Sequence, residues 1–509
     1  MPSRRPNILL ITSDQQHFST LGTVNPRIRT PALDRLCREG TRFDRAYCPN
    51  PTCTPSRASI LTGMYPSQHG AWSLGTKLFE DVPTVSALLA RAGYATSLIG
   101  KAHFQPLASR PGMESLECQP TLRDLDFWRG FHGPWYGFDH VEIARMHANE
   151  SHAGQHYALW LEEQGLTNWR DYFQPWPPTA PASGRPYYEV DNRHWDLPER
   201  FHYSRWTGER TRAVLQRAAA ADASFFCWAS FHDPHPPYLA PSPWDALYRP
   251  EDMEPGKLTP GEHDANPIQH RLSQEERPDF SIFREDQAVH GGHSHLHSEE
   301  SLRRDMAVYY GMVSLMDEEI GRTLDELDRL GLSENTLVVF TTDHGHFLGQ
   351  HGLVAKCLHH YEDLLRVPFI VRWPGRVPRR CATDALQNLV DLAPTFLRAA
   401  GLDVPGVMTG VDQTQAWEGG PEARAWSVTE NRHTLTKVHL RTYVERRWKM
   451  TVYRGGEDGE LFDLEEDRGE VRNRWRDPAY AGVKAEVMHR FLQATLQCEP
   501  TRMPRIAGA

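Results

Sequence analysis

The chain has 509 residues, enough for one large α/β domain with a smaller companion or for three average domains. Its 56 Lys and Arg against 66 Asp and Glu give a formal net charge of -10 without a long basic run, which argues against a nucleic-acid partner and leaves a small anionic substrate open. No segment approaches 18 apolar residues, the first apolar run is too short for a secretory signal, and the eight cysteines show no paired spacing, so we expect a cytoplasmic protein with reduced thiols and no membrane contact.

Four short apolar runs predict buried strands, at residues 7–12, 95–99, 224–231 and 336–342. Each run is followed within a few residues by polar side chains capable of chemistry: Asp14 and Gln15, Lys101 and His103, His235, and Asp343 and His344. Helical patterns separate the runs, at residues 30–39, 84–92, 208–221 and 299–330. This alternation predicts a mostly parallel sheet with helices on both faces and a site at the carboxyl ends of the strands.

Between the first two strands, the string Cys-Thr-Pro-Ser-Arg-Ala-Ser-Ile-Leu-Thr-Gly runs from Cys53 to Gly63. Pro55 suits the first turn of a helix, so we expect Cys53 at or just before a helix N-terminus. The free backbone amides there, together with Arg57 one turn further on, would hold an anion. The alternative is a buried cysteine that only caps an ordinary helix.

The Cys53 string resembles the signature of type I sulfatases, in which the cysteine of C-x-P-S-R, followed by L-T-G, is oxidised to formylglycine, an aldehyde that works as its hydrate. The polar groups after the four strands occur in this family's order, and Lys356 follows the Asp-His-Gly element as the family's lysine does. Residues 459–470 resemble a late element of the family. The resemblance spans about residues 7–473 and implies an alkaline-phosphatase-like α/β fold.

By this resemblance one divalent cation would lie beside the modified Cys53, held by Asp14, Gln15, Asp343 and His344. Oxygen ligands suit a hard ion, so Ca²⁺ is the expected metal, and the single imidazole leaves Mn²⁺ or Mg²⁺ as alternatives. The Asp-Gln and Asp-His pairs resemble the choline-sulfatase and phosphonate-monoester-hydrolase branches of the family.

The catalytic residues implied by the resemblance are Cys53, Arg57, Lys101, His103, His235 and Lys356. Lys101 and His103 would flank the hydrate, with His103 as candidate base. His235 would be the candidate acid on the leaving-group side, where Lys356 would bind the ester. The implied reaction is hydrolysis of a sulfate monoester through a covalent sulfo-enzyme, after maturation by a formylglycine-generating enzyme.

Two other functions stay open at this point. A phosphonate monoester or phosphodiester hydrolase could use the same nucleophile. A catalytically inactive anion-binding relative would keep Cys53 unmodified.

Residues 105–205 are rich in Trp, Tyr and Pro, and we expect them to overhang the strand ends and line the substrate pocket. The alternative is packing and contacts between subunits of a homo-oligomer. The polar run at residues 256–298, which contains His290, His293, His295 and His297, is predicted to be an exposed loop rather than a second metal site.

The chain is predicted to form two domains, a catalytic α/β domain at residues 1–412 and a small C-terminal α+β subdomain at residues 425–509. Residues 413–424 would link them. Within the subdomain we expect short strands at residues 440–445, 449–453 and 461–464, forming a small antiparallel sheet, and a last helix at residues 483–497.

Overall fold

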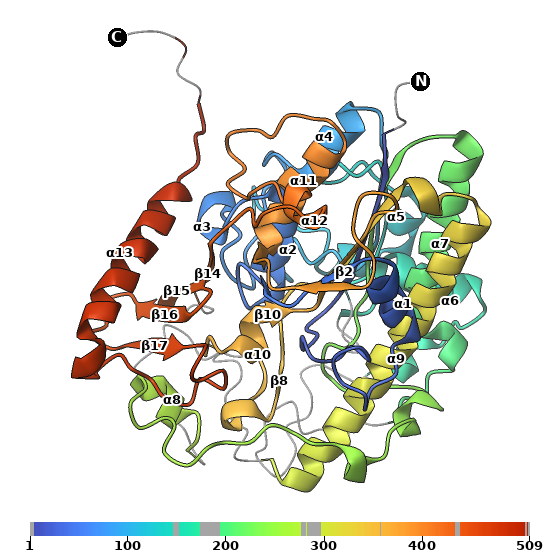
Figure 1. Ribbon diagram of the computed structural model, residues 1–509. Helices are drawn as coiled ribbons and strands as arrows, with labels where there is room; N and C mark the ends of the chain where they lie inside the picture. Colours follow the sequence, from blue (N-terminus) through green and yellow to red (C-terminus); the bar gives the residue numbers. More distant parts are fainter. Residues whose placement is uncertain are drawn as a thin grey trace.

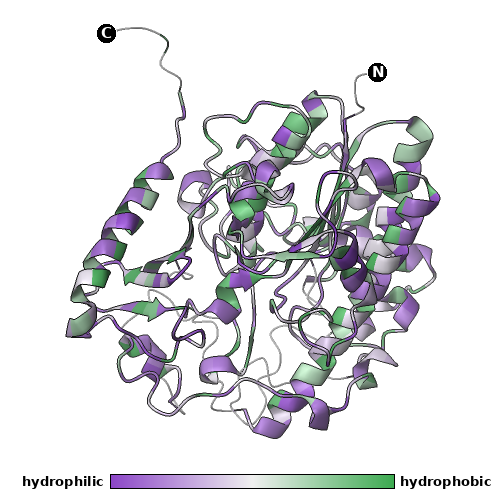
Figure 2. Ribbon diagram, in the orientation of Figure 1, coloured by the Kyte–Doolittle hydropathy of each residue, from purple (hydrophilic) through white to green (hydrophobic). Residues whose placement is uncertain are grey.

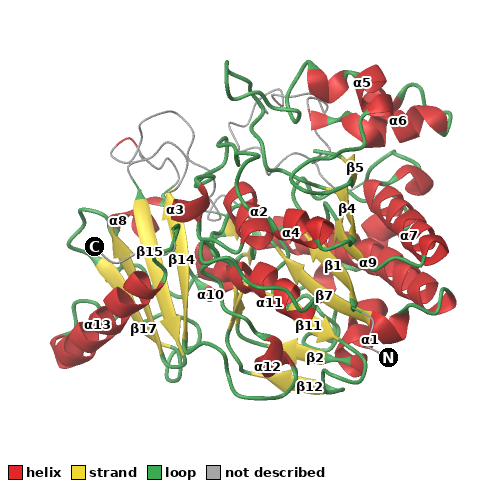
Figure 3. Cartoon of the chain, turned by 90° about the horizontal axis from the view of Figure 1, so that it is seen from above, coloured by secondary structure: helices red, strands yellow, loops and turns green. Residues whose placement is uncertain are grey.

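The computed structural model describes residues 5–145, 152–173, 194–275, 281, 297–356, 358–432, 438–503 and 506. Within these residues the central sheet has eight strands: β1 (Asn7–Ser13), β2 (Thr41–Phe43), β4 (Ala95–Gly100), β5 (His140–Ile143), β6 (Phe225–Ser230), β7 (Thr336–Thr342), β11 (Phe369–Arg372) and β12 (Cys381–Thr383). Their order is β12-β2-β11-β7-β1-β6-β4-β5. Figure 1 shows the whole chain, and Figure 3 labels most of the strands of this sheet. The strands from β7 to β5 are all parallel, and β11 is antiparallel to both of its neighbours. The predicted mostly parallel sheet is therefore confirmed.

Helices cover both faces of this sheet, as Figure 3 shows from above. One face carries α1 (Pro31–Glu39), α7 (Tyr203–Ala221) and α9 (Glu299–Arg329), and the other carries α2 (Cys53–Thr62), α4 (Val85–Arg91) and α11 (Leu392–Ala399). Successive residues of β1 face opposite sides of the sheet. Leu9 packs in the core beneath α1, α7 and α9, and Leu10 packs in the core beneath α2, α4 and α11. Burial on both faces explains why these strands are continuous apolar runs in the sequence.

The predicted helices and strands occur with small shifts at their ends. β7 has the predicted bounds, whereas α7 begins five residues before its predicted start at Gly208. Gly208 lies inside α7, close to Glu319 of α9. A side chain at position 208 would collide with Glu319, so the glycine allows the two helices to pack closely.

A second sheet of four antiparallel strands contains β14 (Trp426–Arg432), β15 (His439–Glu445), β16 (Trp448–Tyr453) and β17 (Gly459–Asp463). The last helix, α13 (Ala481–Gln497), packs on it through Val487 and Phe491. Figure 2 shows hydrophobic and hydrophilic residues alternating along α13, as expected for a helix with one buried face. The sequence analysis missed β14, the edge strand of this sheet.

Shorter elements complete the described part of the chain: β3 (Ala46–Tyr47), β8 (Phe347–Leu348), β9 (Val354–Ala355), β10 (Arg366–Val367), β13 (Gln387–Asn388), α3 (Pro66–His69), α5 (Leu125–Gly130), α6 (Gln155–Glu163), α8 (Ile268–Leu272), α10 (Glu362–Leu365) and α12 (Thr414–Trp417). The seven described cysteines form no disulfide. In the part of the chain that the structure describes, no helix is both long and apolar enough to cross a membrane.

Several aromatic residues of the 105–205 stretch are buried and serve packing, among them Trp128, Trp135 and Trp169. Glu117 of the same stretch accepts the His103 backbone N–H, and the lining of a substrate pocket stays a prediction. Trp176, Tyr187 and Tyr188 lie outside the described residues, as do Cys357, His290, His293 and His295. Of the four clustered histidines only His297 is described, and it is partly buried.

Candidate active site

Cys53 is the first residue of α2, as its sequence context predicts. The N-cap residue Thr52 has extended backbone angles, and every residue of α2 is buried. The helix ends at Gly63, whose φ of 64° is left-handed. A Cβ at Gly63 would lie 3.1 Å from Pro394, so a larger residue would be both strained and crowded. The glycine of the Leu-Thr-Gly string therefore fixes the end of the helix that carries Cys53.

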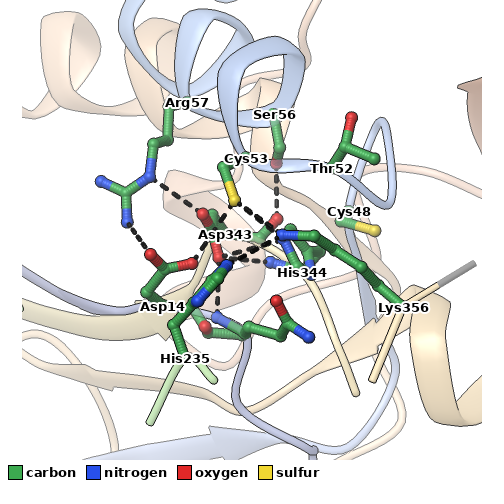
Figure 4. Close-up of polar contacts among 12 residues, drawn as sticks. Asp14, Cys48, Thr52, Cys53, Ser56, Arg57, His235, Asp343, His344 and Lys356 are labelled. Carbon is green, nitrogen blue, oxygen red and sulfur yellow. Dashed lines mark hydrogen bonds and ion pairs between the residues drawn. The ribbon is translucent and has the colours of Figure 1, made fainter. Parts of the chain in front are cut away.

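Asp14 and Asp343 meet beside Cys53 because they follow β1 and β7, which are parallel neighbours. Ligand atoms of Asp14, Cys53, Asp343 and His344 lie within 4.8 Å of one another (Figure 4). Cys53 Sγ is 3.6 Å from Asp14 Oδ1 and 3.3 Å from His344 Nε2. Since His344 Nδ1 contacts the Gly345 carbonyl at 2.9 Å, the ring turns Nε2 towards the cluster.

Two buried cations hold the carboxylates. Arg57 Nε donates to Asp343 Oδ2 at 2.9 Å, and Lys101 Nζ contacts Asp14 Oδ2. Burial alone would raise the pKa of Asp14, but Lys101 and Arg57 outweigh it and hold this pKa well below its usual range. Arg57 is fixed by a further 2.7 Å hydrogen bond from Nη1 to Ser230 Oγ. Asp14 is therefore ionised and ready to bind a cation.

Lys356 lies next to Cys53 and contacts both His235 and His344. Lys356 Nζ lies 3.1 Å from Cys53 Sγ and 3.2 Å from His235 Nε2. His235 Nδ1 contacts the Pro236 carbonyl at 2.6 Å, so Nδ1 carries a proton and Nε2 accepts from Lys356. Burial, followed by the charge of Lys356, lowers the pKa of His235 well below its ordinary value. The free protein thus holds a neutral imidazole next to an ammonium.

His103 follows β4 in a left-handed conformation with φ of 58°. Its backbone N–H donates to Glu117 Oε1 at 2.9 Å, and Gln105 N donates to the other oxygen of the same carboxylate at 2.8 Å. Burial, then the charges of Arg145 and Lys101, keeps the pKa of His103 well below its ordinary value. The ring is therefore neutral.

Gln15 has a backbone φ of 61° and donates its N–H to Asp343 Oδ1 at 3.0 Å. Its side-chain Oε1 is buried and has no hydrogen-bond partner among the described residues. Asp14, Asp343 and His344 lie together with Cys53, and Gln15 is joined to them through its backbone contact with Asp343. Carboxylate, amide and imidazole groups of this kind fit a divalent cation.

Residues 6–402 match the family model described as Sulfatase. The chain belongs to the sulfatase family. A second model, described as the C-terminal part of N-sulphoglucosamine sulphohydrolase, matches residues 349–497. The suspected resemblance is thus confirmed over most of the chain.

Among curated sulfatases, "Uncharacterized sulfatase YidJ" of Escherichia coli (strain K12) is 27% identical over 491 residues, covering 95% of this chain and 86% of the relative. Choline-sulfatase of Rhizobium meliloti (strain 1021) is 27% identical over 483 residues, covering 94% and 84%. The solved phosphonate monoester hydrolase from Silicibacter pomeroyi matches with a TM-score of 0.77 at 24% identity, over 97% of this chain and 96% of that one. This structural likeness confirms the alkaline-phosphatase-like fold.

The sequence analysis missed four residues that shape this sulfatase site: Ser230, Glu117, Arg145 and His346. Ser230 ends β6, so its place at a strand end was a usable signal. His346 also had one, since it lies three residues after Asp343. Glu117 and its 3.6 Å partner Arg145 lie in the aromatic stretch, where no periodicity marks them.

Proposed function

We propose that this sulfatase hydrolyses sulfate monoesters with a nucleophile made by oxidation of Cys53 to formylglycine. The observation that carries the proposal is the position of Cys53 Sγ, between Lys356 Nζ at 3.1 Å and the Asp14, Asp343 and His344 cluster. Burial, then the charge of Asp14, raises the pKa of the Cys53 thiol, so an unmodified thiol stays protonated and is a poor nucleophile. An oxygen nucleophile at this position avoids that difficulty.

The cation would be held by Asp14, Gln15, Asp343 and His344, with Ca²⁺ expected and Mn²⁺ or Mg²⁺ as alternatives. When bound next to the formylglycine hydrate, it would supply an acidified hydroxyl for attack on sulfur. Because Lys101 and Arg57 hold the pKa of Asp14 well below its usual range, this carboxylate need lose no proton on binding the metal.

The remaining side chains divide the proton transfers between them. Lys356 would bind the ester oxygens. Its ammonium is hydrogen-bonded to His235 Nε2, which can take up a proton there and donate it from the same nitrogen to the leaving oxygen, because Nδ1 is held by the Pro236 carbonyl. His103 is neutral, so it can accept the proton whose removal releases sulfate and restores the aldehyde. The small anionic ester and, during maturation, a formylglycine-generating enzyme are the partners that this proposal requires.

The first test is mass spectrometry of the tryptic peptide at residues 46–57, from protein produced with a formylglycine-generating enzyme. This peptide also contains Cys48, which has no Pro-Ser-Arg context and serves as an internal control. We expect the thiol-to-aldehyde mass change at Cys53 alone. Finding only thiol at Cys53 in protein that hydrolyses sulfate esters would disprove the nucleophile.

The second candidate function is hydrolysis of phosphonate monoesters or phosphodiesters. It is favoured by the Asp14–Gln15 and Asp343–His344 pairs and by the structural likeness to a phosphonate monoester hydrolase. Lys101 and a neutral His103 favour the sulfate ester, which must be held while a base breaks down the intermediate. We therefore expect a higher kcat/KM for an aryl sulfate than for the aryl phosphonate with the same leaving group, and a phosphonate preference would select the second function.

A further inference from the structure

The side-chain amide nitrogen of Gln15 has a buried hydrogen-bond partner, His346. Gln15 Nε2 lies 2.9 Å from His346 Nδ1, while Tyr309 Oη donates to the Gln15 carbonyl at 2.9 Å. With the backbone N–H on Asp343, three of the four polar groups of Gln15 are engaged. The fourth, Oε1, is the buried oxygen without a partner in the described part of the chain.

The ring of His346 is held by two tyrosines, Tyr309 and Tyr238. Its ring stacks on Tyr309, with centroids 4.8 Å apart and planes 8° apart, and meets Tyr238 edge-on at 5.9 Å. His346 Nε2 lies 2.8 Å from Tyr238 Oη. His346 and Tyr309 are fully buried, so neither ring can turn without moving its neighbours.

The two contacts of His346 define its tautomer. An amide nitrogen only donates, so His346 Nδ1 must accept from Gln15 Nε2. The single ring proton is then on Nε2 and is donated to Tyr238 Oη. If the Gln15 amide were reversed, its NH₂ group would point at the carboxylates and the metal, where it can bind no cation.

We propose that His346 is a positioning residue that takes the Gln15 amide N–H and so turns Gln15 Oε1 to the divalent cation. His346 does not touch the cation and acts through Gln15 alone. Tyr238 supports it by accepting the Nε2 proton. The inference rests on the metal site of the proposed function but on no particular substrate.

The test measures the dissociation constants of Ca²⁺, Mn²⁺ and Mg²⁺ by chelator competition, without any ester present. Loss of a hydrogen-bonded partner behind a metal ligand costs about 10- to 100-fold in affinity, so we expect a loss of that size for His346→Leu. His346→Asn places an acceptor near the Nδ1 position and should stay within about threefold of wild type, because the contact to Gln15 survives. Thermal unfolding in chelator shows whether each variant folds.

A double-mutant cycle decides whether His346 acts through Gln15. We expect Gln15→Ala to weaken binding, and Gln15→Ala with His346→Leu to be no weaker than Gln15→Ala alone. Tyr238→Phe, which keeps the ring and loses the acceptor, should weaken binding less than His346→Leu and provides a second measurement if His346→Leu does not fold.

Equal losses from His346→Leu in both backgrounds, or unchanged affinity in that variant and in Tyr238→Phe, would overturn the positioning role while the metal site stands. A wild-type protein that binds none of Ca²⁺, Mn²⁺ and Mg²⁺ would overturn the metal site itself. A protein that binds metal as described but hydrolyses no sulfate ester would contradict the proposed function and still support the role of His346.

Discussion

Two buried clusters of charge in this molecule differ in their balance. The first lies between α10 and the C-terminal sheet, where Lys449 Nζ is 3.2 Å from Glu362 Oε1 and 2.7 Å from Glu470 Oε1. Lys449 is fully buried, and carboxylates take two of its three N–H donors. This cluster joins two parts of the fold, and its charges are paired, because Arg366 Nε also lies 3.6 Å from Glu362 Oε2.

The cluster around Cys53 has one more cation than carboxylates. Arg57 and Lys101 pair with the two carboxylates Asp343 and Asp14, and the third cation, Lys356, faces the Cys53 sulfur instead of a carboxylate. A buried cation that no carboxylate neutralises costs free energy. Surplus positive charge in a buried cluster therefore favours binding of an anion. This contrast supports a structural role for Lys449 and the proposed substrate-binding role of Lys356, and substitutions can separate the two.

The largest effect is expected at the sulfur itself. Cys53→Ser keeps the size of the side chain but cannot form an aldehyde, and we expect a loss of about 10⁴-fold in kcat/KM for an aryl sulfate, as for other nucleophile replacements. A serine ester has no second hydroxyl with which to release sulfate, so any residual turnover should leave a sulfated side chain that intact-mass measurement detects. Activity equal to wild type would contradict the aldehyde nucleophile.

The next largest effect concerns stability. Lys449→Met removes the cation that Glu470 contacts and leaves Glu362 with Arg366 alone, and we expect a loss of about 3–5 kcal/mol in the free energy of unfolding, measured with urea at pH 8. Burial, partly offset by Lys449, raises the pKa of Glu470 to about 7. Without the lysine this carboxyl takes up a proton more readily, so the loss should be smaller at pH 5.

The activity of the Lys449→Met variant is the control for its structural role. Per folded molecule, kcat/KM should be unchanged, because none of the three charged groups touches the Cys53 cluster in the described structure. A loss of activity without a loss of stability would assign Lys449 to the reaction and remove the contrast between the clusters.

Lys356→Met is the converse experiment. It removes the surplus cation, and we expect kcat/KM to fall by about 10²- to 10³-fold, the usual effect of removing one group that stabilises transition-state charge. The urea midpoint should be equal to or higher than that of wild type, because a buried ammonium is replaced by an apolar chain of similar length. A destabilisation as large as that of Lys449→Met would show that Lys356 is structural.

Local patterns predicted polar residues at the ends of the strands, and the resemblance to sulfatases added Cys53 and the metal ligands. The run at residues 336–342 is apolar throughout and ends at Asp343, and β7 has those bounds. Parallel neighbours then bring Asp14 to Asp343 by topology alone. The short strings around Cys53 and Lys101 required no knowledge of distant contacts.

Contacts between segments far apart in the sequence could not be predicted. β14 was missed because Glu430 and Asn431 break its apolar pattern, yet Glu430 is buried and accepts hydrogen bonds from the Ser67 backbone and hydroxyl at 2.9 and 3.0 Å. Arg145, at the end of β5, belongs to the aromatic stretch and is recognised only through Glu117. In such a pair, each group offsets the free-energy cost of burying the other. A single sequence does not show which residues form the pair.

The smallest effect concerns a second group of charges next to α10, made up of Asp363, Glu262 and His351. Asp363, next to Glu362, lies 3.6 Å from His351 Nε2, and Glu262 Oε1 lies 3.0 Å from His351 Nδ1. Burial opposes the charge of His351, but Asp363 and Glu262 outweigh it and raise its pKa to about 9. The charged ring also stacks on Tyr361 with centroids 3.6 Å apart.

Because the folded pKa of His351 is above the unfolded value of about 6.5, its charge stabilises the fold by about 2–3 kcal/mol at pH 6, and this contribution is lost as the pH rises through about 9. We expect His351→Gln to lower the free energy of unfolding by that amount at pH 6 and by about 1 kcal/mol at pH 9.5, where only neutral hydrogen bonds are exchanged. Urea denaturation at both pH values measures the difference. This trend is opposite to that of Lys449→Met, whose deficit grows with pH, because His351 supplies the positive charge only when it is protonated. If His351→Gln lowers the free energy of unfolding equally at both pH values, the ring is neutral in the folded protein and does not pair with Asp363 and Glu262 as a cation.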